Sequence, residues 1–128
     1  MRSIILAMLR QPLAQRLIAK LNKAVGVRAI YESDYDKVLS AVSAGCADTI
    51  LIEIAEKGIY DAEFCLALCA TLRRETPDCR LLLLCPEKDE TSVSAVLRGR
   101  RGGWIDDFLF YDASIDFLVS KLLVSPNV

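Results

Sequence analysis

The sequence predicts an α/β fold in which a five-stranded parallel sheet carries helices on both faces. Short runs of consecutive apolar residues alternate along the chain with segments whose apolar residues recur at helical spacing. The runs lack an alternation of polar and apolar residues, which is typical of parallel strands buried on both faces. The length of 128 residues fits one domain with a proper core, so we expect residues 1–128 to fold as a single unit.

Each expected strand is an apolar run bounded by turn or helix signals. The fourth run is halted by Pro86, and the second follows Gly26. The five runs lie at 3–9, 27–31, 49–54, 80–85 and 104–110.

Each expected helix has a start signal. Pro12 suits the first turn of the first helix, which ends at Gly26. Ser33 or Asp34 can cap the second helix, which closes at Gly45. The remaining starts are Asp61 for the third helix, the segment 87–91 for the fourth, and Asp112 or Ser114 for the last.

The order of these elements favours one topology. Right-handed crossovers limit a chain of alternating strands and helices to a few sheet orders, and we predict the flavodoxin-like order 2-1-3-4-5. Ligands of such sheets bind beyond the carboxyl ends of the strands. Glu53 stands near the end of the third strand, where a carboxylate is costly to bury without a partner.

Composition excludes several classes of function. The chain has 16 Lys and Arg against 17 Asp and Glu, which argues against a whole-domain nucleic-acid surface. No apolar run approaches the roughly 18 residues of a membrane span, and no signal peptide is recognisable. Five cysteines without histidine fit a reducing cytoplasm and exclude Ser-His and Cys-His nucleophile pairs. We expect a cytoplasmic chain with no membrane partner.

Two motifs point to a known family. The third strand lies in Asp48-Thr-Ile-Leu-Ile-Glu53-Ile-Ala-Glu-Lys-Gly58, and the fifth carries Asp106-Asp-Phe-Leu109. With the element order, these motifs resemble the receiver domain of two-component response regulators over essentially the whole chain. The resemblance places Glu53 at the phospho-acceptor position and Gly58 on a family glycine, with Lys57 replacing the family proline.

The chain differs from the family at the residues that bind metal and support phosphorylation in receivers. Met8 and Leu9 match the two acidic residues that hold Mg²⁺ in receivers, and neither can ligate a hard cation. Cys85 matches the family Ser/Thr, Tyr111 the family lysine, and Phe108 the switch aromatic. The resemblance therefore implies a pseudo-receiver with no metal or cofactor, which is not phosphorylated by the standard route.

Two interpretations of Glu53 remain open at this stage. It is a built-in negative charge that fixes an activated-like state, or a partly solvated strand-end carboxylate held by backbone N–H groups or by Lys57. Cys65 and Cys69 share a helix face, and we expect small buried hydrophobes there because a metal site would need further ligands.

A basic cluster is the candidate partner surface. Arg98, Arg100 and Arg101 lie among glycines before Trp104, which we expect to form a mobile loop. Arg and Trp are enriched in interface hot spots. The alternatives are an anion or nucleic-acid phosphate site, and a solvated loop with Trp104 packed inward.

These observations predict a non-enzymatic signalling module that acts through protein–protein contacts. Its expected partners are an effector domain, another signalling protein, or a second copy bound through helix 4, strand 5 and helix 5. Nucleic acid is expected only through an attached output domain. The alternative function is a small-molecule or redox sensor that uses the pocket of Met8, Leu9, Cys85 and Tyr111.

Overall fold

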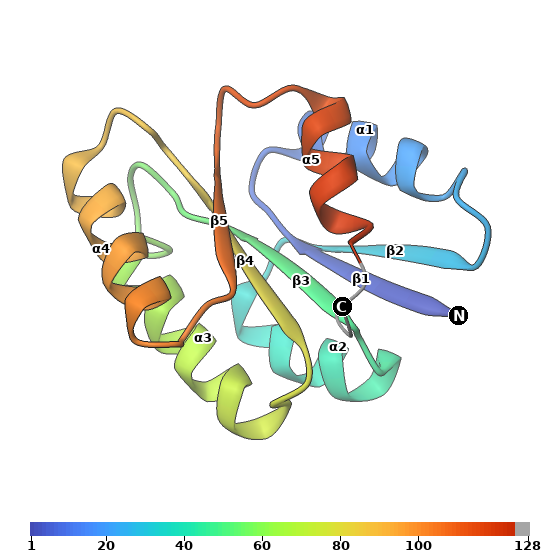
Figure 1. Ribbon diagram of the computed structural model, residues 1–128, viewed down its shortest axis with the longest axis horizontal. Coiled ribbons are helices and arrows are strands. Elements are labelled where there is room, and N and C mark those ends of the chain that lie inside the picture. Colours follow the sequence, from blue (N-terminus) through green and yellow to red (C-terminus); the bar gives the residue numbers. More distant parts are fainter. Residues whose placement is uncertain (125–128) are drawn as a thin grey trace.

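The computed structural model, which describes residues 1–124, contains a five-stranded parallel sheet of order β2-β1-β3-β4-β5 (Figure 1). All four strand pairings are parallel, as the apolar runs predicted. The strands are β1 (Arg2–Ala7), β2 (Val27–Glu32), β3 (Thr49–Glu53), β4 (Arg80–Cys85) and β5 (Asp107–Phe110). The helices are α1 (Gln11–Leu21), α2 (Val38–Gly45), α3 (Ala62–Glu75), α4 (Glu90–Arg101) and α5 (Ile115–Leu122), with a 3₁₀ turn at Tyr35–Lys37.

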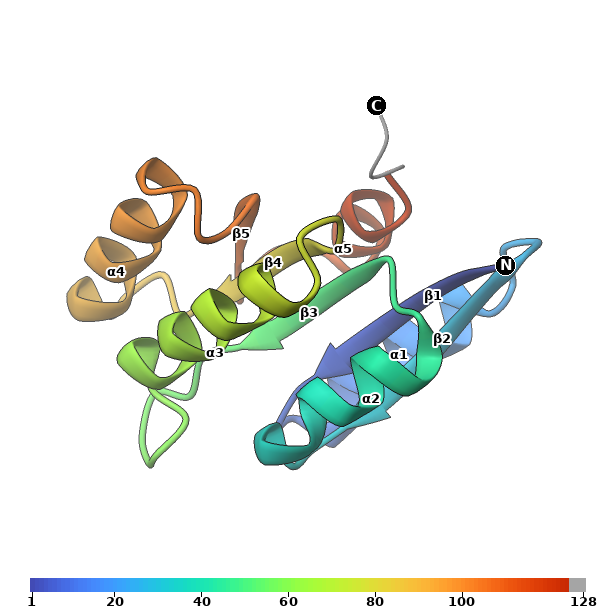
Figure 2. The same ribbon diagram turned by 90° about the horizontal axis from the view of Figure 1, so that it is seen from below.

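The sheet separates two apolar layers. Successive residues of a strand point to opposite faces, so Ile5 and Ile50 pack beneath α2, α3 and α4, whereas Ile4 and Leu51 pack beneath α1 and α5. Figure 2 shows this division, with α2 and α3 on one side of the sheet and α1 and α5 on the other. Every residue of β3 is buried, including its terminal glutamate.

Two of the predicted helix caps are confirmed. Asp61 and Ser114 each accept a hydrogen bond from a backbone N–H three residues later, in α3 and α5 respectively. Asp34 instead caps the 3₁₀ turn, and α2 begins after it at Val38 without a side-chain cap. The first helix also lacks one, because Arg10 at its N-cap makes no capping bond with its side chain. This helix ends at Leu21 rather than at Gly26.

The basic segment after the fourth helix was predicted incorrectly as a mobile loop. α4 continues to Arg101, so Arg98, Arg100 and Arg101 form its last turn. Basic side chains are favourable there because the helix dipole places negative charge at its C-terminus. Gly103, with φ of 79°, follows the helix in the left-handed conformation, and β5 begins only at Asp107, three residues later than expected.

Two strand ends near the expected site also differ. β1 ends at Ala7, which places Met8, Leu9 and Arg10 in the loop before α1. β3 ends at Glu53, one residue earlier than predicted.

The cysteines are thiols, and four of the five are buried. Cys65 and Cys69 lie on the buried face of α3, as predicted, and burial raises the pKa of Cys69 to about 12. Within residues 1–124, His, Cys, Asp and Glu side chains form no group of three or more suited to a metal ion. None of the helices in this range is long and apolar enough to span a bilayer.

Candidate functional site

Glu53 is a buried carboxylate with an ion-pair partner. Only 2% of the residue is exposed. Its Oε1 accepts hydrogen bonds from the backbone N–H groups of Leu9 (2.9 Å) and Arg10 (3.2 Å), and its Oε2 accepts one from Arg10 Nε (2.8 Å). Both carboxylate oxygens are therefore engaged by the loop between β1 and α1. Charge-assisted bonds of this kind offset the cost of burying the charge.

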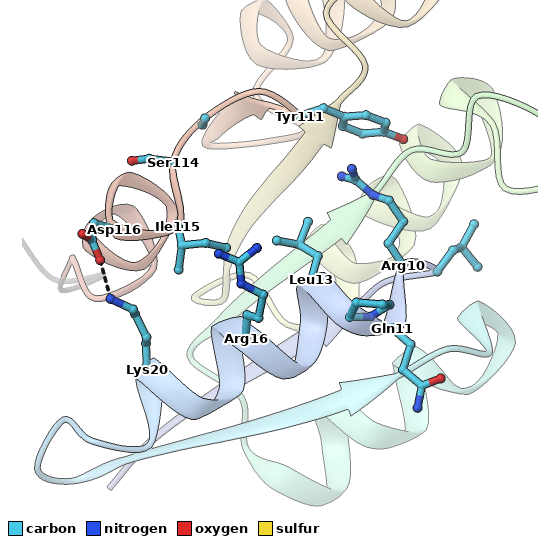
Figure 3. A pocket seen from close by; sticks show the side chains of 12 residues that line it. Arg10, Gln11, Leu13, Arg16, Lys20, Tyr111, Ser114, Ile115 and Asp116 are labelled. Atoms are coloured by element: carbon cyan, nitrogen blue, oxygen red, sulfur yellow. Dashed lines mark hydrogen bonds and ion pairs between the residues drawn. The ribbon is translucent and has the colours of Figure 1, made fainter.

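Arg10 was not identified as a site residue from the sequence. It follows Leu9 directly, and its guanidinium carbon lies 4.0 Å from the centre of the Tyr111 ring, an arrangement visible in Figure 3. Its side chain is 41% exposed, so one side faces Glu53 while another reaches the surface. The sequence did contain one signal for Arg10: it directly follows Met8 and Leu9, the two positions that match the acidic residues of receivers.

Aromatic hydroxyls hold the backbone around Glu53. Tyr111 donates to the carbonyl of Ile54, and Tyr35 donates to the carbonyl of Glu53 at 2.5 Å. Tyr35 also stacks against Tyr60, with ring centres 4.0 Å apart. Burial is the main cause that raises the pKa of both Tyr35 and Tyr111. Both phenols thus stay protonated as donors.

The remaining residues of the predicted pocket differ in how far they are buried. Met8 and Cys85 are fully buried, and Phe108 is half-buried with its ring 5.5 Å from that of Phe110. Burial raises the pKa of the Cys85 thiol to about 11, so this thiol is neutral at physiological pH. Leu9 is exposed and contributes its backbone N–H to Glu53.

Lys57 plays no part in holding Glu53. It is exposed in the loop after β3, and the salt bridge of Glu53 is formed with Arg10. The prediction that backbone N–H groups hold Glu53 is confirmed, and the prediction that Lys57 holds it is wrong. The same interpretation assumed a partly solvated carboxylate, which is also wrong because Glu53 is buried.

The side chains around Glu53 are suited to an internal ion pair and not to binding a divalent cation. Mg²⁺ takes oxygen ligands in octahedral geometry. The side chains that follow β1 offer a thioether, an isobutyl group and a guanidinium, and that guanidinium already neutralises Glu53. The arrangement can therefore store a fixed charge pair at the carboxyl end of β3.

The basic turn of α4 forms local ion pairs. Arg98 contacts Glu63 of α3 at 2.9 Å, and Arg100 lies 3.8 Å from Asp107. Trp104 is 45% exposed, which contradicts the interpretation that packs it inward. Glu63, Arg98 and Trp104 border a small groove of about 280 Å³ between α3 and α4.

Neither a protein-family model nor a curated protein matches this sequence. Solved structures do match. A response regulator from Thermotoga maritima is 15% identical with a TM-score of 0.74, covering 94% of this chain and 92% of its own. The receiver domain of a histidine kinase from Syntrophus aciditrophicus is 18% identical with a TM-score of 0.76, covering 95% and 87%.

A structure described as an adenylate cyclase from Rhodopirellula baltica is 13% identical with a TM-score of 0.78, covering 94% of this chain and 84% of its own. At such identities the likeness concerns the fold. The sheet order, the layers of helices and these structures together give one conclusion: this chain has the CheY-like fold of response-regulator receiver domains.

Proposed function

We propose that this chain is a receiver-like signalling module that acts through protein–protein contacts and without phosphorylation. The observation that carries this proposal is the Arg10–Glu53 ion pair, which occupies the position that the family resemblance gives to the phospho-acceptor. An acceptor carboxylate needs free oxygens for the incoming phosphoryl group. Both oxygens of Glu53 already accept hydrogen bonds.

The neighbouring side chains support the same conclusion. Phosphoryl transfer depends on positioning and on neutralisation of charge by metal and cation. Met8 and Leu9 supply no metal ligands, and Tyr111 stands where the resemblance places a lysine. The guanidinium of Arg10 is bound to Glu53 itself. We infer that the module performs no phosphoryl chemistry and is not an enzyme.

The proposal is tested by phosphorylation in vitro. The protein is incubated with Mg²⁺ and acetyl phosphate and examined by intact mass spectrometry, with a phosphorylatable receiver treated in parallel as a positive control. We expect the unmodified mass only, and an adduct mapped to Glu53 would overturn the proposal. Glu53→Asp serves as a second sample, which we also expect to stay unmodified because its neighbours still lack metal ligands.

The proposed contact surface comprises α4, β5 and α5. Large apolar side chains are exposed on each of these elements, notably Leu97, Phe110 and Phe117, together with Trp104 before β5. β5 is also the edge strand beyond β4, with only four residues. Exposed apolar side chains beside arginines favour a protein partner. We propose a second copy of the chain or an effector domain.

Self-association is measured by light scattering over a range of concentrations. If a second copy is the partner, Phe117→Asp is expected to shift the protein to monomer. Ile59→Asp is the matched control, because Ile59 is 74% exposed in the loop after β3 and lies outside this surface. A wild type that stays monomeric throughout would exclude the second copy and leave the effector domain.

The structure gives no support to a redox sensor at Cys85. A reactive cysteine needs a lowered pKa and access to solvent. Cys85 is fully buried, and its pKa is raised by burial and by the charges of Asp89 and Glu87. The buried thiols do support a reducing compartment, and we propose that the chain acts in the cytoplasm.

A further inference from the structure

A groove of about 960 Å³ lies between α1 and α5, beside the Glu53 site (Figure 3). Its apolar lining comes from both helices and from the loops that precede them, including Leu9, Pro12, Leu13, Tyr111 and Ile115. Its polar lining contains three basic side chains on one wall, Arg10, Arg16 and Lys20. Its size and its mostly apolar lining with a few polar groups are typical of small-molecule sites, and the groove is open to solvent on one side.

The charges in the groove are not balanced. Lys20 pairs with Asp116 at 2.7 Å, and Arg10 pairs with Glu53 through Nε. Arg16 forms no salt bridge with any other residue in the range 1–124. The groove wall therefore carries one guanidinium charge without a counter-charge.

Arg10 also presents an unused donor. Its Nη2 atom is buried and has no hydrogen-bond partner within the described part of the chain. A buried donor of this kind is costly unless it is paired. Arg10 lines the groove, so the charge of its guanidinium also contributes to the field there.

Both helices that border the groove also start there. Ser114 and Ile115, at the start of α5, line it, as do Gln11 and Pro12 at the start of α1. The amino ends of helices carry partial positive charge. Their contribution has the same sign as that of the arginines, so the local field favours an anion.

We propose that this groove binds a soluble small molecule made of an anionic group, a carboxylate or phosphate, attached to an apolar or aromatic body. The anion lies against Arg16, within the positive field of the Arg10 guanidinium, and the body covers Leu13 and Ile115. The groove shares α5 with the proposed contact surface, but Leu97, Trp104, Phe110 and Phe117 do not line it. Its test measures ligand binding, so the outcome does not depend on whether Glu53 is phosphorylated.

The probe is 1-naphthyl phosphate, titrated into uniformly ¹⁵N-labelled protein and followed by amide chemical shifts. We expect saturable binding, with the largest shifts at Leu13, Arg16 and Ile115. Inorganic phosphate and 1-naphthol each carry half of the proposed chemistry. We expect each to bind at least about tenfold more weakly than 1-naphthyl phosphate. 1-Naphthol lacks the charge-assisted contact, which contributes roughly that factor, and inorganic phosphate lacks the apolar contacts.

Variants distinguish specific binding in the groove from a general attraction of the probe to basic side chains. Arg16→Gln is expected to weaken 1-naphthyl phosphate binding about tenfold, and Arg16→Glu further. Arg74→Gln is the matched control because Arg74 is exposed at the end of α3, away from the groove, and we expect no change. Equal losses for Arg16→Gln and Arg74→Gln, equal binding of 1-naphthol, or absence of saturation would each overturn the proposal.

Discussion

The Arg10–Glu53 pair should contribute measurably to stability because one partner is buried. Removing one member of a fully buried pair costs about 3–5 kcal/mol. Arg10 is 41% exposed, and Glu53 keeps two backbone donors when the guanidinium is lost. We therefore expect Arg10→Gln to lower the free energy of unfolding by about 2 kcal/mol, in the range of one charge-assisted hydrogen bond.

A double-mutant cycle isolates the interaction itself. Arg10→Gln, Glu53→Gln and the double variant are unfolded in urea and followed by the fluorescence of Trp104, the only tryptophan. We expect a coupling free energy of about 1.5 kcal/mol between the two residues.

The chain provides a control pair of nearly the same length. Lys20 and Asp116 are 2.7 Å apart, against 2.8 Å for Arg10 and Glu53, but their side chains are 49% and 83% exposed. Exposed pairs contribute at most about 1 kcal/mol and often much less. The Lys20→Gln and Asp116→Asn cycle should give a coupling below about 0.5 kcal/mol. If the two cycles gave equal couplings, burial would not be what strengthens the Arg10–Glu53 pair, and the reasoning would fail.

Three further predictions concern the surroundings of the site. Tyr35→Phe removes the hydroxyl that donates to the Glu53 carbonyl and should cost about 1–2 kcal/mol of unfolding free energy; no loss in urea would contradict that role. Gly58 has φ of 98°, so Gly58→Ala should cost about 1 kcal/mol through backbone strain, measured in the same way. The pKa of Cys85 rises from about 9 unfolded to about 11 folded, so its thiol ionises first in the unfolded chain. The free energy of unfolding should fall between pH 9 and pH 11, and Cys85→Ala should reduce this slope by up to about 1.4 kcal/mol per pH unit.

The sheet could be predicted because its signals are local. The runs at 3–9, 49–54 and 80–85 are almost wholly apolar, and each crossover is short. The periodicity of the sequence and the handedness of crossovers therefore suffice to predict the order of the strands. The end of α4 could not be predicted in this way. Gly99 suggests a loop, yet a β-carbon there would lie 2.7 Å from the Leu66 side chain, so the glycine allows α4 to approach α3. That reason depends on a contact between helices, which the local pattern does not contain.

The partner of Glu53 was missed for a similar reason. Lys57 is four residues away in sequence, whereas Arg10 is 43 residues away. The pairing arises because β1 and β3 are neighbours in the sheet, which brings the loop after β1 over the end of β3. The turn at residues 8–10 then aims two backbone N–H groups and Nε at one carboxylate. The direction of an arginine side chain in such a turn is decided by the fold.

Arg10 connects the Glu53 pair to the groove, and this connection gives the last prediction. Arg10 contacts Glu53 through Nε, and Arg16 supplies the contact to the anion, so an anion in the groove does not need to break the pair. Glu53 nevertheless offsets the positive charge that the groove presents. Glu53→Gln should therefore tighten 1-naphthyl phosphate binding by up to about tenfold, as expected when a nearby like charge is removed in a partly shielded site. Amide shifts of the free protein check that the variant keeps its fold. A variant that folds but binds the probe more weakly would mean that Glu53 acts on the groove by positioning Arg10, and not through its charge.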